Sequence, residues 1–396
     1  MLSIGVKNMN IFKILEKYEP RSMHGQIPIA WDQAKDSFIW DNKGKKYIDF
    51  TSGIAVANAG HNNPRIVKSI RDAELYHSYI FPTEIKAKYI KELCEFTGFE
   101  KAFFLSSGTE STEAAIKLMR IHTRKKDIIS FIGAMHGRTS IAENLKGDYS
   151  WATKDQYIHP IPFPPKESFK DSIWWDSSTN MIAGVMIETY QGWSAQFFDN
   201  RYIQDLITYC KSRGILVCFD EIQAGFGRTG KMFGYEHYEI PKPDLVCIGK
   251  GMTSSVPMSG VLGSAEILDN PGVGDMSSTH SGNPLCCSAA LANLREIRKL
   301  LPSLEQKEHI LFDSLKNVPF DLKVNGRGLV AAIFTESADF SEKVCFEAAE
   351  NGLLLLRTGK PTIKIMPPLT IGIDVLSQGI EILLESIKKV NNDKKY

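Results

Sequence analysis

The stretch ILVCFDEIQAGFGRTG (residues 215–230) decides the fold, together with PDLVCIGKGM (residues 243–252) that follows it. Each contains a short apolar run, and each run leads directly to a charged residue, Asp220 in the first and Lys250 in the second. Short continuous apolar runs are typical of strands that are buried on both faces, as in a parallel sheet. We therefore expect two buried strands of one sheet, with a carboxylate at the end of one and an amine at the end of the other.

Similar apolar runs recur from residue 102 to about 265, and amphipathic segments separate several of them. They are AFFL (102–105), IISFI (128–132), IAGVMIE (182–188) and SGVLG (259–263). The separating segments include STEAAIKLMRIHTRKK (111–126) and NRYIQDLITYCKSRG (200–214). This alternation predicts an α/β fold with a mostly parallel central sheet that helices cover on both faces.

The rest of the chain predicts a smaller α+β part. Residues 38–50 alternate around a turn like a β-hairpin, the proline-rich residues 159–166 are expected in a surface loop, and a helix is expected at about 284–316. A length of 396 residues suits two domains. We expect an N-terminal segment packing with the small domain, a large domain and a C-terminal small domain, at residues 1–50, 51–290 and 291–396 respectively.

Composition narrows the class of protein. Hydrophobic residues make up 43% of the chain and charged residues 23%, the balance of a globular protein, and the net charge of +1 provides no field to attract nucleic acid or a membrane. No stretch has the length of a membrane span. The N-terminus lacks the features of a signal peptide, and seven scattered cysteines without a CxxC pair favour a reducing compartment. A cytoplasmic enzyme without a nucleic-acid or membrane partner is the expectation.

Polar residues at the strand ends suggest the chemistry, because ligands of open α/β sheets bind outside the carboxyl ends of the strands. Ser107, Gly108 and Thr109 precede a helix, where they either form a plain cap or hold a phosphate. Asp220 either caps the next loop or stays ionised beside a cation such as a protonated pyridine ring. Lys250 is either a desolvated, nucleophilic amine, a phosphate ligand or a solvated side chain. Together they match the three needs of pyridoxal 5'-phosphate (PLP): a phosphate anchor, an acid for the ring nitrogen and a Schiff-base lysine.

The sequence resembles the class III (subgroup II) aminotransferases of PLP fold type I, which include the acetylornithine, ornithine and 4-aminobutyrate enzymes. The resemblance extends over about residues 25–390. It is carried by FTSGIAVANAGHNNP, FFLSSGTESTEAAIKLMR, GAMHGRTS, CFDEIQAGFGRTGKMFGYE, PDLVCIGKGM, STHSGNPLCCSAALANL and IKIMPPLTI. It implies the PLP-dependent transferase fold and amino-group transfer by a ping-pong mechanism.

The resemblance also implies roles for individual residues. Lys250 would form the Schiff base and shuttle the substrate proton, and Asp220 would pair with the ring nitrogen. The remaining cofactor contacts would be Ser107, Gly108, Thr109, Met135, His136, Glu188, Gln223 and, across a homodimer interface, Thr279. The substrate contacts would be Ile54, Arg138, Trp193 and Lys364, with a structural ion pair as an equal alternative for Arg138. No residues have the spacing of a metal site.

Two departures from the family pattern bear on the substrate. Lys364 stands where glutamate-using relatives have an arginine that grips a carboxylate, and lysine provides only a point charge there. Trp193 stands where such relatives have a glutamate that masks this arginine, and a glutamate without its arginine would be an unpaired buried charge. We expect either an amine, an amino sugar or a sugar-derived keto compound against the Trp193 wall, or an amino acid or 4-aminobutyrate held by Lys364.

Other functions remain to be weighed. Decarboxylases, racemases and aminomutases of fold type I share the same lysine, aspartate and phosphate set, so the motifs alone leave the reaction open. A non-catalytic protein on this fold would be expected to lack Lys250 or Asp220, and both are present.

Overall fold

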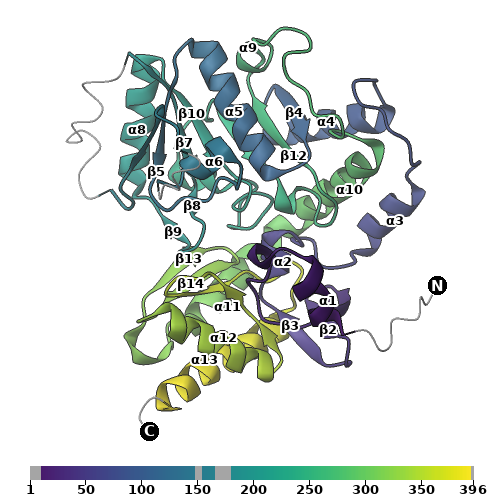
Figure 1. Ribbon diagram of the computed structural model, residues 1–396, viewed down its shortest axis with the longest axis vertical. Coiled ribbons are helices and arrows are strands. Elements are labelled where there is room, and N and C mark those ends of the chain that lie inside the picture. The colour runs from purple at the N-terminus through teal and green to yellow at the C-terminus, as the bar shows by residue number, and fades with distance from the viewer. Residues whose placement is uncertain (1–9, 148–153, 166–179, 394–396) are drawn as a thin grey trace.

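The computed structural model describes residues 10–147, 154–165 and 180–393. Figure 1 shows two stacked parts, a larger one built on a seven-stranded sheet and a smaller one that contains both the N-terminal strands and the C-terminal helices. Among the described residues, no helix combines the length and the apolar character that crossing a membrane requires.

The large sheet has the order β4-β12-β11-β10-β7-β5-β6, and it is parallel except for β12, which runs antiparallel to both of its neighbours. Its strands are β4 Lys101–Leu105, β5 Asp127–Phe131, β6 Ile158–Ile161, β7 Ile182–Glu188, β10 Leu216–Asp220, β11 Leu245–Ile248 and β12 Ser259–Gly263. Every residue of β7, β10 and β11 is buried. The prediction of a mostly parallel sheet of doubly buried strands is confirmed.

Helices cover both faces of this sheet. Successive residues of each strand point to opposite faces, so neighbouring residues belong to different cores. Phe219 of β10 belongs to the core that contains α8, whereas Cys218 belongs to the core that contains α5. The helices of the large part are α3 Pro64–Asp72, α4 Glu84–Thr97, α5 Gly108–Thr123, α6 Ser140–Asn144, α8 Asn200–Arg213, α9 Ala265–Leu268 and α10 Pro284–Leu300. The two-layer covering expected from the sequence is therefore present.

Two sequence expectations are wrong, and proline explains both. The stretch expected to be a loop at 159–166 begins with the edge strand β6, in which Pro160 is tolerated because an edge strand has one side that needs no ladder bond. The helix expected to continue to about residue 316 instead ends at Leu300 and restarts as α11 Leu304–Leu315. Pro302 lies in the break, since proline lacks the N–H that a continuous helix needs.

The smaller part contains two four-stranded sheets, β1-β2-β3-β15 and β13-β14-β17-β16. Its strands are β1 Trp31–Lys35, β2 Phe38–Asp41, β3 Lys46–Asp49, β13 Val324–Arg327, β14 Val330–Phe334, β15 Leu353–Leu354, β16 Leu356–Arg357 and β17 Thr362–Ile365. Its helices are α1 Ile11–Tyr18, α2 Ser52–Ala55, α12 Ala338–Glu350 and α13 Ile373–Asn392, besides α11. The hairpin expected at 38–50 is β2 with β3, and β3 pairs with the C-terminal strand β15. The division expected at residue 290 falls inside α10.

Several short elements lie along the chain besides these helices and strands. They are the two-stranded ribbon of β8 Tyr190–Gln191 and β9 Gln196–Phe197 and the 3-10 turns η1 Arg21–Met23, η3 Gly234–Tyr238, η4 Lys250–Met252, η5 Leu301–Ser303 and η6 Pro319–Asp321.

Arg228 joins the two parts. Its side chain is fully buried, and Nη1 donates to the carbonyl oxygens of Leu329 (2.9 Å) and Pro367 (2.6 Å). Nη2 donates to Asn58 Oδ1 (2.6 Å) and Ser52 Oγ (3.3 Å). The two terminal nitrogens therefore fix the loop after β10 against the segment that contains Ser52 and Asn58 and against the C-terminal part, through dipoles rather than a carboxylate. The buried Nε has no partner among the described residues.

Candidate active site

The carboxyl ends of three strands meet around one side chain, Ile222. A methyl group placed on Gly108, just beyond β4, would lie 3.2 Å from Ile222, and one placed on Gly249, just beyond β11, would lie 3.3 Å from it. Ile222 itself follows β10 by two residues. The small residues at these positions thus let the start of α5, the end of β10 and the residue before Lys250 come together.

A cavity lies at these strand ends. It is lined by Met135, Glu188, Tyr190, Asp220, Ile222, Gln223, Ala224 and Lys250. Lys250 follows β11 after a single residue, Gly249, and has a positive φ of 40° that turns the chain out of the strand. The structure therefore brings Lys250, Asp220, Gln223, Glu188 and Met135 to one cavity.

Asp220 takes part in two hydrogen bonds at the end of β10. Its Oδ2 lies 2.7 Å from His136 Nδ1, and its Oδ1 accepts from the Ile222 backbone N–H at 3.0 Å. Both side chains are almost completely buried. Burial alone would lower the pKa of His136, but the hydrogen bond to Asp220 and the charges of Asp220 and Glu188 outweigh it and raise that pKa. His136 therefore holds one oxygen of the Asp220 side chain, and its own Nε2 has no partner among the described residues.

Lys250 has the electrostatic setting of a nucleophilic amine. Burial lowers its pKa, and the nearby carboxylates of Asp220 and Glu188 offset part of that effect. A lowered pKa increases the fraction of the free amine at neutral pH. Glu188 responds in the opposite direction, because burial raises its pKa and the charge of Asp220 adds to the rise.

Gln223 connects the cavity to Lys364. Lys364 Nζ donates to Gln223 Oε1 at 2.6 Å and lies 5.3 Å from the centre of the Tyr190 ring. Lys364 is fully buried and is absent from the residues that line the cavity. Burial lowers its pKa to about 7.

The start of α5 has features of a helix cap and also of a phosphate site, the two alternatives that the sequence left open. Ser107 forms a capping box with Glu110, whose Oε2 accepts from Ser107 N (2.7 Å), Ser107 Oγ (2.9 Å) and Ser106 N (3.1 Å). The N–H groups of Gly108 and Thr109, at the first two helical positions, have no intrahelical acceptor and point from the positive end of the helix. Ser107 is thus a cap in this structure, while Gly108 and Thr109 retain donors for an anion.

The expected substrate residues lie outside the lining of this cavity. Arg138 is 72% exposed and only loosely paired with Glu143, with 4.0 Å between Nη1 and Oε1. Ile54 lines a separate apolar groove with Trp31. Trp193 contacts the smaller part: its carbonyl oxygen accepts from Thr362 Oγ1 (3.2 Å), and its ring packs edge-on against Phe334 at 6.2 Å. The structure therefore leaves Arg138 free to move and places Trp193 at the junction of the two parts.

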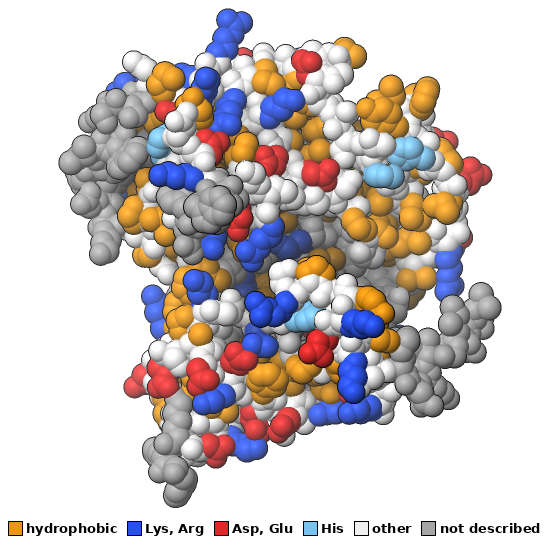
Figure 2. All heavy atoms as spheres, in the orientation of Figure 1, with side chains coloured by type: hydrophobic (Ala, Val, Ile, Leu, Met, Phe, Trp, Pro, Cys, Tyr) orange, Lys and Arg blue, Asp and Glu red, His pale blue; other side chains and the backbone are white. Residues whose placement is uncertain are grey.

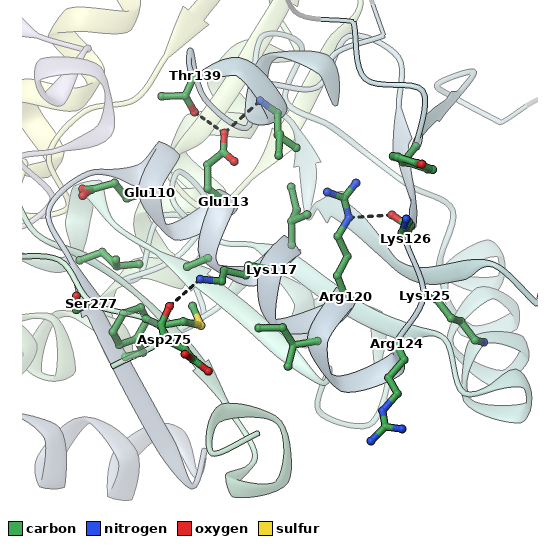
Figure 3. Close-up of a pocket in the computed structure, with 18 residues that line it drawn as sticks. Glu110, Glu113, Lys117, Arg120, Arg124, Lys125, Lys126, Thr139, Asp275 and Ser277 are labelled. Atoms are coloured by element: carbon green, nitrogen blue, oxygen red, sulfur yellow. Dashed lines mark hydrogen bonds between the residues drawn. The ribbon is translucent and has the colours of Figure 1, made fainter. Parts of the chain in front are cut away.

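Thr279 is exposed and lies outside the lining of the cavity that contains Lys250. Its neighbour Ser278 donates to Glu110 Oε1 at 3.2 Å, so this segment runs beside the start of α5. Figure 3 shows a second, larger cleft of about 950 Å³ whose walls include α5 and residues 275–277. Lys117 closes one side of it by donating to the carbonyl oxygen of Asp275 at 2.7 Å.

Three lining residues, Tyr190, Ile222 and Ala224, were not predicted from the sequence. Ile222 and Ala224 lie within the quoted DEIQAG motif, so their proximity to Asp220 was the available signal. Tyr190 lies on β8, two residues after Glu188, in a ribbon too short to be recognised from its pattern. Within the described part of the chain, no group of three His, Cys, Asp or Glu residues is arranged to hold a metal ion.

The donor set fits PLP. The helix start can hold a phosphate, the ionised Asp220 can pair with a protonated ring nitrogen, and Lys250 presents an amine of lowered pKa. The three groups come from the ends of different strands that Ile222 holds together.

Comparison with known proteins agrees with this chemistry. The family model described as Aminotransferase class-III matches residues 20–387. An acetylornithine aminotransferase of Methanocaldococcus jannaschii is 33% identical and covers 95% of this chain and 98% of its own length. A 4-aminobutyrate aminotransferase of Mycobacterium leprae is 29% identical over 96% of this chain and 95% of its own length.

A solved structure shows the same fold. The ornithine aminotransferase of Toxoplasma gondii, described with PLP in its active site, superposes with a TM-score of 0.88 at 23% identity and covers 99% of this chain and 97% of its own. The family answers the question of reaction class that the motifs left open, and the fold is that of the type I PLP aminotransferases. The chain belongs to the class III aminotransferases, and its cofactor is pyridoxal 5'-phosphate.

Proposed function

We propose that Lys250 holds the cofactor aldehyde through its amine and that Asp220 keeps the ring nitrogen protonated. When bound, PLP supplies an electron-accepting ring that makes a proton on the amino-bearing carbon removable. With PLP bound, Lys250 Nζ would be the group that takes this proton and returns it during transfer. His136 and the Ile222 N–H keep Asp220 charged throughout. The observation that carries this proposal is that Lys250 and Asp220 line one cavity.

Borohydride reduction tests the role of Lys250. Reduction of the holoenzyme should fix the cofactor mass on the peptide that contains residue 250, and Lys250→Ala should lose both this label and the transamination activity. Lys343→Ala, at an exposed lysine on α12, is the matched control and should retain both. A label found on another lysine, or an active Lys250→Ala enzyme, would overturn the assignment.

For the substrate, we propose an amine or an amino-sugar-type compound. One support is that Lys364 lies outside the cavity lining and donates its hydrogen bond to Gln223. The other is that Trp193 stands where the resemblance implies an acidic residue. An aromatic wall packs well against hydrocarbon chains and sugar rings.

A second substrate class has its own support. Two relatives described above are named as an acetylornithine and a 4-aminobutyrate aminotransferase. Arg138 is exposed and loosely paired, so it is available for a carboxylate. A panel of amino donors decides between the two classes. Preference for amines without a carboxylate supports the first class, whereas efficient turnover of acetylornithine, ornithine or 4-aminobutyrate would replace it with the second.

We also propose a homodimer in which Thr279 contributes to the partner subunit's phosphate site. In support, the segment near Thr279 borders exposed apolar side chains: Tyr79 OH donates to Ser277 Oγ at 3.1 Å, and Ile80 and Phe81 are 68% and 70% exposed. Figure 2 shows hydrophobic side chains gathered on the upper part, on the side where Figure 1 places α3 and α4. Such patches are typical of interfaces.

The cytoplasmic location stays a prediction, in line with seven unpaired cysteines.

A further inference from the structure

The bond between Lys364 and Gln223 determines how the Gln223 amide is oriented. A lysine ammonium or amine has hydrogens to donate, so the amide group facing Lys364 at 2.6 Å is the oxygen, Oε1. Gln223 also lines the cavity of Lys250. Its Nε2 makes no hydrogen bond to any other described residue, and it is therefore left to donate into the cavity.

Lys364 is held firmly in this position. It belongs to β17, in which every residue is buried, and its backbone is paired on both sides, with Ala332 of β14 and Leu356 of β16. The ionisable groups that act on it are Glu188, Lys250 and Arg228, and the Tyr190 ring covers it. Nζ has Gln223 Oε1 as its hydrogen-bond partner among the described residues, so moving Nζ toward a substrate would break this bond and leave Gln223 Oε1 without its donor.

We propose that Lys364 is a positioning residue that fixes the Gln223 amide with its NH₂ group toward the cavity of Lys250, and that it does not grip a substrate carboxylate. The resemblance to the class III aminotransferases implies that the phenolic oxygen of bound PLP would lie near Gln223. The proposal rests on the cofactor site described above. A hydrogen bond from Nε2 favours the ionised form of a phenolic oxygen. Loss of Lys364 lets the amide turn over or move, and the phenolic oxygen then ionises less readily.

The measurement is the pH titration of the visible absorption of the bound cofactor. A hydrogen bond of ordinary net strength corresponds to a shift of about 0.5–1 pH unit. We expect Lys364→Met and Gln223→Leu each to raise the midpoint by about this amount. Lys364→Arg, which retains a donor, should keep the midpoint near that of the unmodified enzyme and remains informative if Lys364→Met does not fold.

A double-mutant cycle separates positioning from a direct effect of charge. If Lys364 acts through Gln223, then Lys364→Met in the Gln223→Leu background should add nothing to the shift. An additional shift in that background would mean that the Lys364 charge acts on the cofactor directly and would overturn the proposal.

Kinetics provide an independent readout. Lys364→Met should lower kcat/KM by a similar factor for amino donors with and without a carboxylate. A rise of KM confined to carboxylate donors, with an unchanged absorption midpoint, would show that Lys364 binds substrate. Failure of the cofactor site itself is distinguishable, because the unmodified protein would then show no visible absorption to titrate.

Discussion

At the scale of single residues, the charge of Asp220 is the property on which the proposed chemistry depends most. Asp220→Asn keeps the shape and can still accept from the Ile222 N–H, but it carries no negative charge to hold a proton on the ring nitrogen. We expect a fall in kcat/KM of about 100-fold or more, as for the loss of a preorganised electrostatic partner. The visible absorption of the cofactor should persist, since Lys250 still holds it. An Asp220→Asn enzyme of normal activity would contradict the assigned role.

A second prediction at the residue scale concerns how Lys364 affects the free energy of unfolding. Its pKa falls from an unfolded value of about 10.4 to about 7 in the folded chain. The folded state therefore binds this proton more weakly: the penalty is absent above the unfolded pKa, grows as the pH falls, and is complete below about 7. Lys364→Met removes this penalty but leaves Gln223 Oε1 without its donor, so it should stabilise the apo-protein by about 1–3 kcal/mol near pH 7 and lose this advantage near pH 10.5. Thermal unfolding across this pH range is the measurement, and destabilisation near pH 7 would contradict it.

Single residues of the site could be predicted from the sequence where they directly follow a predicted strand. Their hydrogen-bond partners could not be predicted. Asp220 and Lys250 follow apolar runs, which is a local signal. The partner of Asp220 is 84 residues away and that of Gln223 is 141 residues away, so the pairs exist only once the sheet orders are known. The burial of Lys364 likewise depends on β14 and β16 enclosing β17.

At the scale of elements, the packing of α5 against the loop after β10 is the feature that positions the phosphate donors. Gly108→Ala would place a methyl group 3.2 Å from two carbon atoms of Ile222, closer than an ordinary contact. Because alanine favours a helix, the free energy of unfolding of the apo-protein should change little. The displaced Ile222 should weaken PLP binding by about tenfold, roughly 1.4 kcal/mol. Fluorescence titration of the apo-protein with PLP measures this.

A matched glycine exists for that experiment. Gly372 precedes α13 with a φ of −69°, and a methyl group there would meet nothing within 4 Å. Gly372→Ala should therefore leave PLP affinity unchanged. Equal weakening by both substitutions would mean that the contact with Ile222 is not the cause.

Elements also show where pattern reading succeeds and where it fails. The six predicted strands of the large sheet are continuous apolar runs, and β7, β10 and β11 among them are buried on both faces, which gives a strong signal. β6 contains Pro160, which local rules assign to a loop and which only an edge position permits. The apolar run LLLLR at 353–357 has the pattern of a single strand, yet Leu353–Leu354 pairs with β3 and Leu356–Arg357 pairs with β17 in another sheet. Which sheet a short strand joins is decided by tertiary packing rather than by its own sequence.

At the scale of the whole molecule, the proposed homodimer leads to a prediction about dimers formed from two different inactive variants. In the proposal, the exposed Thr279 of each subunit contributes to the phosphate site of its partner. Suppose that each site takes Lys250 from one subunit and Thr279 from its partner. Thr279→Asp, which places a negative charge against the phosphate, and Lys250→Ala should each abolish activity alone. A dimer with one subunit of each kind then has one site in which both residues are intact, whereas sites confined to one subunit would all carry a defect.

The experiment unfolds and refolds the two inactive variants together and separately, and it measures transamination and molar mass. With statistical mixing, half of the dimers are hybrids and each hybrid has one working site of two, so about a quarter of the original activity should return if the subunits associate randomly. Each variant refolded alone is the control and should stay inactive. Dimers of the expected mass without recovered activity would show that Thr279 acts within its own subunit, because only a site shared across the interface can be rebuilt by mixing.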